Sequence, residues 1–274
     1  MHRLSQRVLS TLALTVLILL AIPLSVQAAF EQSVSNSCIE CHRGLEDSGL
    51  SQPVELWSKS VHAQVGNTCD GCHGGDPNDA SKKSMSAENH FYASPKEDEI
   101  VDFCGKCHQE LANNFKMSAH AETGEQACIG CHGSHTIRRI SLDIINEELC
   151  STCHDYEPAQ KLKGMLLELH EGFRLAESKL QLIKGFPTGP AHEDLKKLWK
   201  ELRQVRMLAH TFDIPRIATE AVKVKASIAE IDGKIEKLST LSKERSRWGY
   251  ITILIFMGLI VLTFFYNKQN QDLD

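Results

Sequence analysis

A chain of 274 residues with a formal net charge of −5 at pH 7 has room for one large domain or two smaller ones. The mildly acidic charge argues against nucleic acid as a partner, because such a partner requires a basic surface. Aromatic residues are sparse, at 6%, whereas the ten cysteines are many for this length, so the cysteines carry most of the functional information.

Residues 1–28 have the pattern of a secretory signal peptide. The basic start MHRLSQR precedes an apolar run at 8–22 and the small-residue sequence VQA, which predicts cleavage after Ala28. An uncleaved anchor is the alternative. In both cases we expect the rest of the chain to face the periplasm, where cysteines meet an oxidising environment.

Residues 29–155 contain all ten cysteines, most of the glycines and many short polar connections. Their apolar side chains are too few for a conventional core, and small domains of this kind need a metal, disulfides or a cofactor to fold. A disulfide framework would give dispersed, irregular cysteine spacing. Here every cysteine instead belongs to one of five copies of a C-x-x-C-H frame, which leaves none for disulfides or for a four-cysteine zinc site.

C-x-x-C-H is the attachment sequence of c-type haem, so the chain is predicted to carry five covalent haems. Two thiols form thioether bonds to the porphyrin, and the adjacent histidine becomes the proximal iron ligand. The predicted attachment residues are Cys38 and Cys41, Cys69 and Cys72, Cys104 and Cys107, Cys128 and Cys131, and Cys150 and Cys153. The predicted proximal ligands are His42, His73, His108, His132 and His154.

The second axial ligand decides whether a haem carries electrons or binds a small substrate. An internal repeat identifies two candidates, because SVHAQVGNTCDGCHG at 60–74 matches SAHAETGEQACIGCHG at 118–133 and places His62 and His120 at equivalent positions. His135 lies too close to His132 to reach the other face of the same haem, so it is expected to bind the iron of a neighbouring one. The further candidates are His90, His170 and His210, whereas His192 is expected to face solvent. Spacing leaves open which histidine serves which haem.

Residues 156–246 lack cysteine and show apolar residues at alternating steps of three and four, which is typical of one face of a helix. The sequence FPTGP interrupts the pattern, and Asp213 with Pro215 resembles a helix start. The three apolar seams predict a helical bundle, or a coiled-coil contact that would make the chain an oligomer. Their residues are Leu162, Leu166, Leu169, Phe173, Ala176, Leu180 and Ile183; Leu195, Leu198, Leu202, Val205, Ala209 and Phe212; and Ile217, Ala221, Val224, Ile228, Ile231, Ile235 and Leu238.

Residues 248–266 form a second apolar segment, and its run from Tyr250 to Tyr266 carries no charge. Roughly 17 to 25 apolar residues span a bilayer core, and aromatic rings at the two ends favour its interfaces. A buried core helix is the alternative. The position in the chain and the polar sequence NKQNQDLD favour a single transmembrane helix, with residues 267–274 as a cytoplasmic tail.

The charges around this segment run against the usual bias. Lys243, Arg245 and Arg247 stand on the predicted outer side, whereas the tail holds Lys268. Cytoplasmic flanks normally carry the excess of lysine and arginine. A cleaved signal peptide would fix the orientation regardless, so the sequence predicts a protein anchored in the plasma (inner) membrane with its main part outside.

The chain resembles the multihaem cytochromes c of bacterial respiration. In particular it is similar to the superfamily of pentahaem nitrite reductases, octahaem hydroxylamine oxidoreductases and tetrahaem cytochromes of ammonia oxidisers. The S-x-H-A…C-x-x-C-H-G repeat, the C-H-G-S-H sequence at 131–135 and the LAHTFD sequence around His210 carry the likeness, which covers residues 38 to about 215.

The resemblance implies an electron-transfer member more than an enzyme. Many of the nitrite reductases carry lysine in place of one proximal histidine, whereas all five motifs here end in histidine. Hydroxylamine oxidoreductases carry eight haems and a tyrosine crosslinked to one of them, and this chain has five motifs. Related membrane-anchored quinol dehydrogenases have their anchor at the N-terminus instead.

We therefore expect a mainly α protein with much irregular loop: a haem-packed cytochrome domain, a helical bundle and one C-terminal transmembrane helix. It would pass electrons between a quinone-linked membrane subunit and periplasmic redox proteins in respiration. The alternative is a multihaem oxidoreductase that acts on a small nitrogen or sulfur compound at one open haem. Seven spare histidines for five irons favour the electron carrier, and five haems exceed what a sensory haem protein would need.

Overall fold

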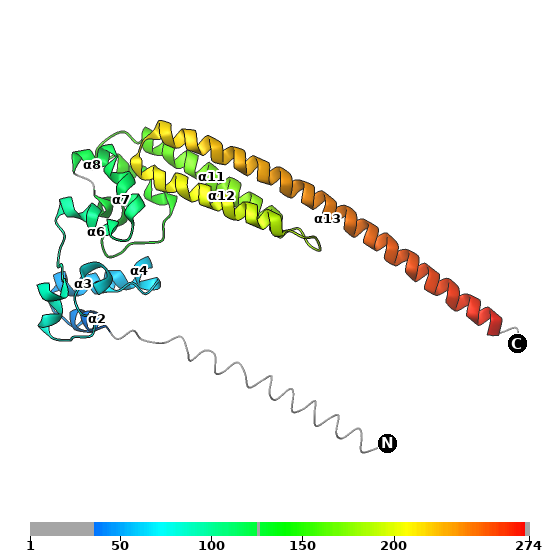
Figure 1. Cartoon of the computed structure of the whole chain (residues 1–274), viewed down its shortest axis with the longest axis horizontal. Coiled ribbons are helices and arrows are strands. Elements are labelled where there is room, and N and C mark those ends of the chain that lie inside the picture. Colours follow the sequence, from blue (N-terminus) through cyan, green and yellow to red (C-terminus); the bar gives the residue numbers. More distant parts are fainter. Residues whose placement is uncertain (1–35, 125–126, 272–274) are drawn as a thin grey trace, which may run out of the picture. The chain divides into compact units, whose positions relative to one another are not determined.

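The computed structural model describes residues 36–124 and 127–271, and the predicted signal peptide lies outside them. Within these ranges the chain is mainly helical and contains no β-strand, as the sequence predicts. It divides into two compact units (Figure 1). Of the described residues, the first comprises those up to Glu55 together with Asn67–Ala93, and the second comprises Leu56–Gly66 and those from Ser94 onward.

The first unit is built from short helices joined by polar loops. These are α2 (Ser37–Arg43), α3 (Ser48–Ser58, which continues into the second unit), α5 (Cys69–His73), η2 (Lys82–Met85) and η3 (Ala87–Asn89). Asn36 caps α2 by accepting hydrogen bonds from the backbone N–H groups of Cys38 and Ile39. Its amide nitrogen also donates to Asp70 at 3.1 Å, which ties α2 to α5.

The second unit begins with more short helices and ends in three long ones. The short elements are α4 (Val61–Gln64), η4 (Glu97–Glu99), α6 (Ile100–Gly105), α7 (Gln109–Lys116), α8 (Ala119–Thr123), α9 (Cys128–His132), η5 (Leu142–Ile144) and α10 (Glu147–Cys150). The long helices are α11 (Glu157–Gln181), α12 (Gly189–Leu208) and α13 (Ile214–Gln271), with the turn η6 (Ala209–Thr211) between the last two.

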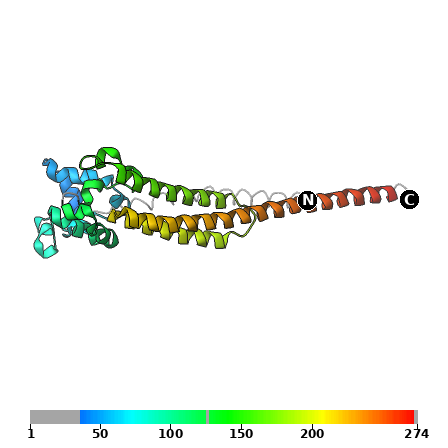
Figure 2. The same ribbon diagram turned by 90° about the horizontal axis from the view of Figure 1, so that it is seen from above.

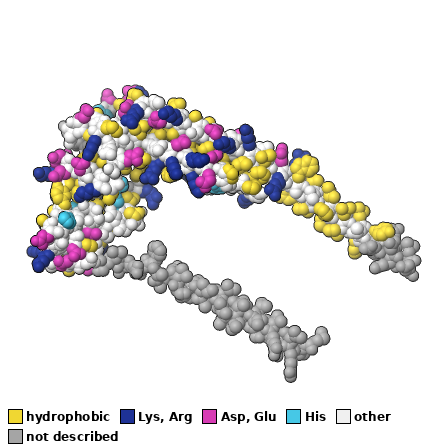
Figure 3. Space-filling model, in the orientation of Figure 1, with side chains coloured by type: hydrophobic (Ala, Val, Ile, Leu, Met, Phe, Trp, Pro, Cys, Tyr) yellow, Lys and Arg dark blue, Asp and Glu magenta, His cyan; other side chains and the backbone are white. Residues whose placement is uncertain are grey.

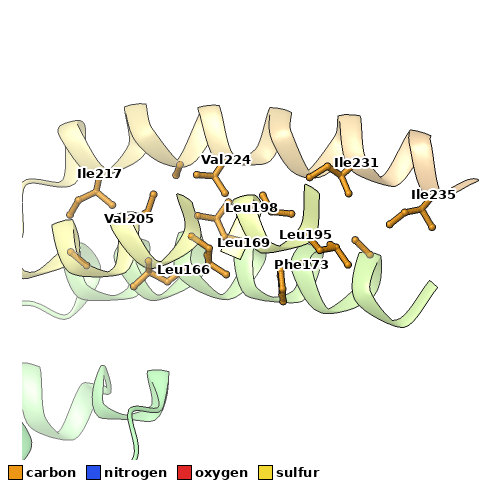
Figure 4. Packing of buried hydrophobic residues seen from close by; sticks show 14 of the residues in the cluster. Leu166, Leu169, Phe173, Leu195, Leu198, Val205, Ile217, Val224, Ile231 and Ile235 are labelled. Atoms are coloured by element: carbon orange, nitrogen blue, oxygen red, sulfur yellow. The ribbon is translucent and has the colours of Figure 1, made fainter. Parts of the chain in front are cut away.

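The three long helices pack into the predicted bundle, and the sequence seams form its core (Figure 4). α11 and α12 lie alongside the first part of α13, after which α13 continues alone (Figure 2). Asp213 caps α13 as predicted, because its carboxylate accepts a hydrogen bond from the Arg216 N–H at 3.1 Å. The fully buried side chains include Leu169, Leu198, Leu202, Ile217 and Ile235.

Phe212 is the seam residue that does not join this core. α12 ends at Leu208, and Phe212 adopts a left-handed backbone conformation with φ of 54°, which carries its side chain out of the seam. Such a conformation is an outlier for a bulky residue and costs free energy. Its ring instead packs against a histidine of the cysteine-rich part of the chain.

The free part of α13 is exposed and apolar, as the space-filling view shows (Figure 3). Among the described residues, the segment that ends at Tyr266 is the one helical segment long and apolar enough to cross a membrane. An apolar surface of this length facing water would be unfavourable, so membrane association is its physical explanation.

Candidate cofactor sites

Three of the five C-x-x-C-H motifs form single helical turns. They occupy α2, α5 and α9, each of which contains both cysteines and the following histidine. The motif at 104–108 begins in the last two residues of α6 and ends just before α7, and the motif at 150–154 begins at the last residue of α10. All ten cysteines lie in the described residues, and none is in a disulfide. The thiols therefore remain available for thioether bonds.

Glycine follows the histidine in the two repeated motifs for a conformational reason. Gly74 and Gly133 have φ of 68° and 73°, values that residues with a Cβ adopt only at a cost in free energy. A Cβ at Gly74 would also collide with the backbone carbonyl of His90. The glycine thus ends the helical turn directly after His73 or His132 and lets the chain turn away from the imidazole ring.

The serine of the S-x-H-A sequence sets the position of the repeated histidine. Ser60 and Ser118 are almost fully buried N-caps, of α4 and α8 respectively. Each hydroxyl accepts a hydrogen bond of 3.2 Å from the backbone N–H three residues later. His62 and His120 consequently occupy the same place in the first turn of two equivalent short helices.

Three pairs of imidazole rings face one another in the second unit. The ring centroids of His62 and His108 are 6.1 Å apart, and those of His120 and His154 are 6.0 Å apart. His132 faces His210, with centroids 6.2 Å apart and an angle of 13° between the planes. A metal ion bound by one nitrogen of each ring, at about 2.0 Å, separates the centroids by roughly 6 Å. Each pair unites the histidine of one motif with a candidate from outside the motifs.

Backbone carbonyls orient several rings among the motif histidines and the facing pairs. The Nδ1 atoms of His42 and His73 donate to the carbonyl oxygens of Leu50 and Tyr92, at 3.3 and 2.9 Å. His154 donates to its neighbour Asp155 at 2.7 Å. In the same way, Nδ1 of His210 donates to the carbonyl oxygen of Arg206 at 3.3 Å. A proton held on Nδ1 leaves Nε2 unprotonated, which is the state that binds a metal.

Burial favours the neutral form of four of the paired rings. It is the main cause that lowers the pKa of His62, His120, His132 and His210 below the ordinary value for histidine. The facing ring lowers the pKa further at the first three. Neutral imidazole is the form required of a metal ligand, so the electrostatics suit ligation.

The motifs lie close to one another within each unit. In the first unit, burial and the neighbouring Cys38 thiol raise the pKa of Cys69 to about 11. In the second unit, a hydrogen bond with Cys104 lowers the pKa of Cys128, and the nearby Cys150 contributes to the raised pKa of Cys131. The third, fourth and fifth motifs are therefore consecutive neighbours in space as well as in sequence.

These residues fit c-type haem better than a bare metal ion. No group of three or more His, Cys, Asp or Glu side chains in residues 36–124 and 127–271 is arranged to hold a metal ion by itself. A porphyrin iron needs only two protein ligands, and the facing pairs supply two. The C-x-x-C thiols next to each motif histidine, none of which forms a disulfide, would supply the attachment points.

Comparison with known proteins agrees with this chemistry. The C-type polyheme cytochrome OmcC of Geobacter sulfurreducens is 25% identical over 124 residues. The match supports a multihaem c-type cytochrome. It covers 45% of this chain and 14% of the relative, so the chain spans only a small part of that protein's length. No protein-family model and no solved structure matches the chain.

The remaining candidate histidines have different surroundings. His170 lies in the bundle, where its Nδ1 accepts a hydrogen bond of 2.8 Å from Arg206. His90 is exposed and ends η3 in a left-handed conformation, and Nδ1 of His135 lies 3.3 Å from the Ser134 hydroxyl. His192, expected to face solvent, is exposed at the start of α12.

Sequence reasoning missed Phe212 and Asn114. The ring of Phe212 meets the ring of His120 edge-on, with centroids 4.2 Å apart. Asn114 donates a hydrogen bond of 2.9 Å to the carbonyl oxygen of Met207, which ties α7 to the end of α12 close to His210. Phe212 fitted the apolar seam of α12, so periodicity gave no signal for its contact with His120.

Proposed function

We propose that this chain is a membrane-anchored, periplasm-facing pentahaem cytochrome c. It transfers electrons between a quinone-linked membrane partner and periplasmic redox proteins in respiration. Haem c, when bound, supplies one-electron redox chemistry at each motif. The chain's own residues attach the cofactor, fix its axial ligands and hold the sites within each unit next to one another.

The three facing imidazole pairs are the observation that carries the proposal. We assign His62, His120 and His210 as the second ligands of the haems whose proximal ligands are His108, His154 and His132. An iron with two histidine ligands has no open position for a substrate, which is typical of an electron carrier. The facing pairs therefore favour electron transfer over catalysis in the second unit.

His90 and His135 are proposed as second ligands as well. With them the chain would supply two histidines for each of five irons. His170 is the weaker candidate, because Arg206 already donates a hydrogen bond to its Nδ1 within the bundle. His90 lies in the same unit as His42 and His73, the two motif histidines that the facing pairs leave over.

The length of α13 supports a partner that presents its redox group outside the bilayer. α13 begins next to the turn that carries His210, and the uncharged run begins at Tyr250. At a rise of about 1.5 Å per residue, roughly 50 Å of helix separates the two. A quinone within the apolar layer could not approach the three sites of the second unit across this distance, so the exchange would run through a partner protein.

The test is electron paramagnetic resonance of the oxidised holoprotein, together with its mass. We expect a mass increase of five haems and low-spin signals only, unchanged by nitrite or hydroxylamine. His62→Ala, His120→Ala and His210→Ala should each convert one haem from low spin to high spin.

His192→Ala is the matched control, because this histidine is exposed at the start of α12, where its Nδ1 donates a hydrogen bond to the Thr188 carbonyl. It should leave every signal unchanged. A high-spin haem in the unaltered protein that binds nitrite or hydroxylamine would favour the oxidoreductase instead. Retention of all low-spin signals in His210→Ala would overturn the assigned pairing.

A further inference from the structure

A shallow, open cavity of about 570 Å³ lies where the loop after α11 meets α13, at the start of the uncharged run. The loop contributes Leu182 and Lys184 to its lining. Ser242 of α13 fixes the loop, because its hydroxyl donates a hydrogen bond of 2.9 Å to the carbonyl oxygen of Lys184. The loop and α13 thus both contribute to the lining of the cavity.

The end of this cavity that precedes the uncharged run is cationic. Lys184, Lys243 and Arg247 all line it, and the hydroxyl of Ser246 lies among them. None of the described residues that line it is acidic. A group with a negative charge and several hydrogen-bond acceptors would complement these side chains.

The end of the cavity within the uncharged run is apolar. Tyr250, Ile251 and Leu254 line it and follow Lys243 and Arg247 at steps of three and four, so they share one face of α13. Tyr250 and Leu254 are each 70% exposed, which leaves their surface open to an apolar occupant. In the space-filling view, basic side chains extend along α13 to the point where the hydrophobic surface begins (Figure 3).

We infer that this cavity binds the headgroup of one anionic phospholipid, with its acyl chains against the apolar face of α13. The inference rests on the proposed membrane anchor, which places the cavity at the level of the lipid headgroups. Basic side chains near a membrane surface attract anionic lipids. The cationic residues match the headgroup of such a lipid, and the apolar residues match its acyl chains.

The lipid site also explains the unusual charge distribution around the anchor. Lys243, Arg245 and Arg247 stand on the side that normally lacks an excess of basic residues. Two of these residues line the cavity and the third lies between them in the sequence. Their function is then to hold a lipid, while the signal peptide sets the orientation.

The test measures lipid binding to the full-length holoprotein in neutral detergent by native mass spectrometry. Phosphatidylglycerol should bind at one site, and phosphatidylcholine at least tenfold more weakly. In the triple variant Lys184→Gln, Lys243→Gln, Arg247→Gln, affinity for phosphatidylglycerol should fall about fivefold for each charge removed. The single variant Lys184→Gln should show the first fivefold step, so the test does not depend on the triple variant.

The matched control removes three charges elsewhere, in Lys196→Gln, Lys200→Gln, Arg203→Gln on α12. It should retain the affinity of the unaltered protein. Unchanged haem content and helix content by circular dichroism confirm that each variant is folded.

Three outcomes would overturn the inference. Equal loss of affinity in both triple variants would show a general charge effect, and competition by millimolar inorganic phosphate would show a site for the free anion. Pairing of two chains with exclusion of lipid would show that a second copy covers the face. Carbonate extraction of membranes tests the anchor separately, because a chain released by carbonate contradicts the proposed anchoring whether or not lipid binds in detergent.

Discussion

The cysteine-rich part of the chain and the three-helix bundle are stabilised in different ways. The bundle has a continuous apolar core along all three helices. In residues 36–155, by contrast, the buried apolar side chains among those described are only Ile39, Val54, Ile100, Ala112, Phe115 and Ala127. A segment with so few buried apolar groups cannot offset the conformational entropy lost on folding without a further contribution. The proposed haems would supply that contribution, whereas the bundle needs none.

The largest expected effect comes from removing all five haems. In a host strain that lacks the c-type haem attachment machinery, we expect residues 36–155 to lose their fold and the bundle to keep its helices. Limited trypsin digestion followed by mass spectrometry should show cleavage throughout the first region and a protected fragment from α11 to α13. Equal protection of both regions would show that the cysteine-rich part folds without the cofactor.

The second prediction concerns the bundle alone. Leu198 is 1% exposed, so Leu198→Ala should lower the free energy of unfolding by about 2 to 5 kcal/mol. Val222→Ala, at a position that is 65% exposed, should change it by less than about 0.5 kcal/mol. Urea unfolding followed by circular dichroism measures both. The haem signals of the folded Leu198→Ala protein should be unaltered, and a change in their spin state would contradict the separation of the two regions.

The third prediction concerns the turn that joins the two regions. Phe212→Leu removes the edge-on contact with His120, which is worth about 0.5 to 1.5 kcal/mol for a pair of aromatic rings. We expect a changed low-spin signal for one haem and unchanged signals for the others. Phe212→Gly should give the same spectral change although it relieves the left-handed backbone, whereas Phe212→Tyr should keep the original signal. A spectral change in Phe212→Tyr alone would exclude a role for the ring contact.

The smallest expected effect is a pH dependence within the bundle. Burial, followed by the charges of Arg206 and Arg174, lowers the pKa of His170 below its ordinary value near 6.5. The unfolded chain then binds the proton more readily than the folded one, so stability should decline as the pH falls below about 6.5 and stay level above it. Urea midpoints between pH 7.5 and 5.0 measure this decline. His170→Gln should reduce it, and an identical profile in that variant would assign the dependence to other histidines.

Much of this protein is determined by the sequence itself, because the relevant information is local. The C-x-x-C-H turns, the serine caps before His62 and His120, the glycines after His73 and His132 and the apolar seams all act over a few residues. Their conformations follow from hydrogen bonding, sterics and helical periodicity. The sequence therefore predicts the helical bundle, the apolar helix that can cross a membrane and the attachment points of the haems.

The pairing of ligands is decided only by the tertiary structure. The repeat makes His62 and His120 equivalent, but it does not say that they face His108 and His154, nor that His210 faces His132. Each pair joins residues far apart in the chain, so packing between helices fixes the partners. The same holds for Phe212. Its position in the apolar seam predicts a place in the core, but its left-handed backbone directs the ring to His120. Sequence thus predicts which residues bind a haem, and the fold decides which imidazole rings face each other.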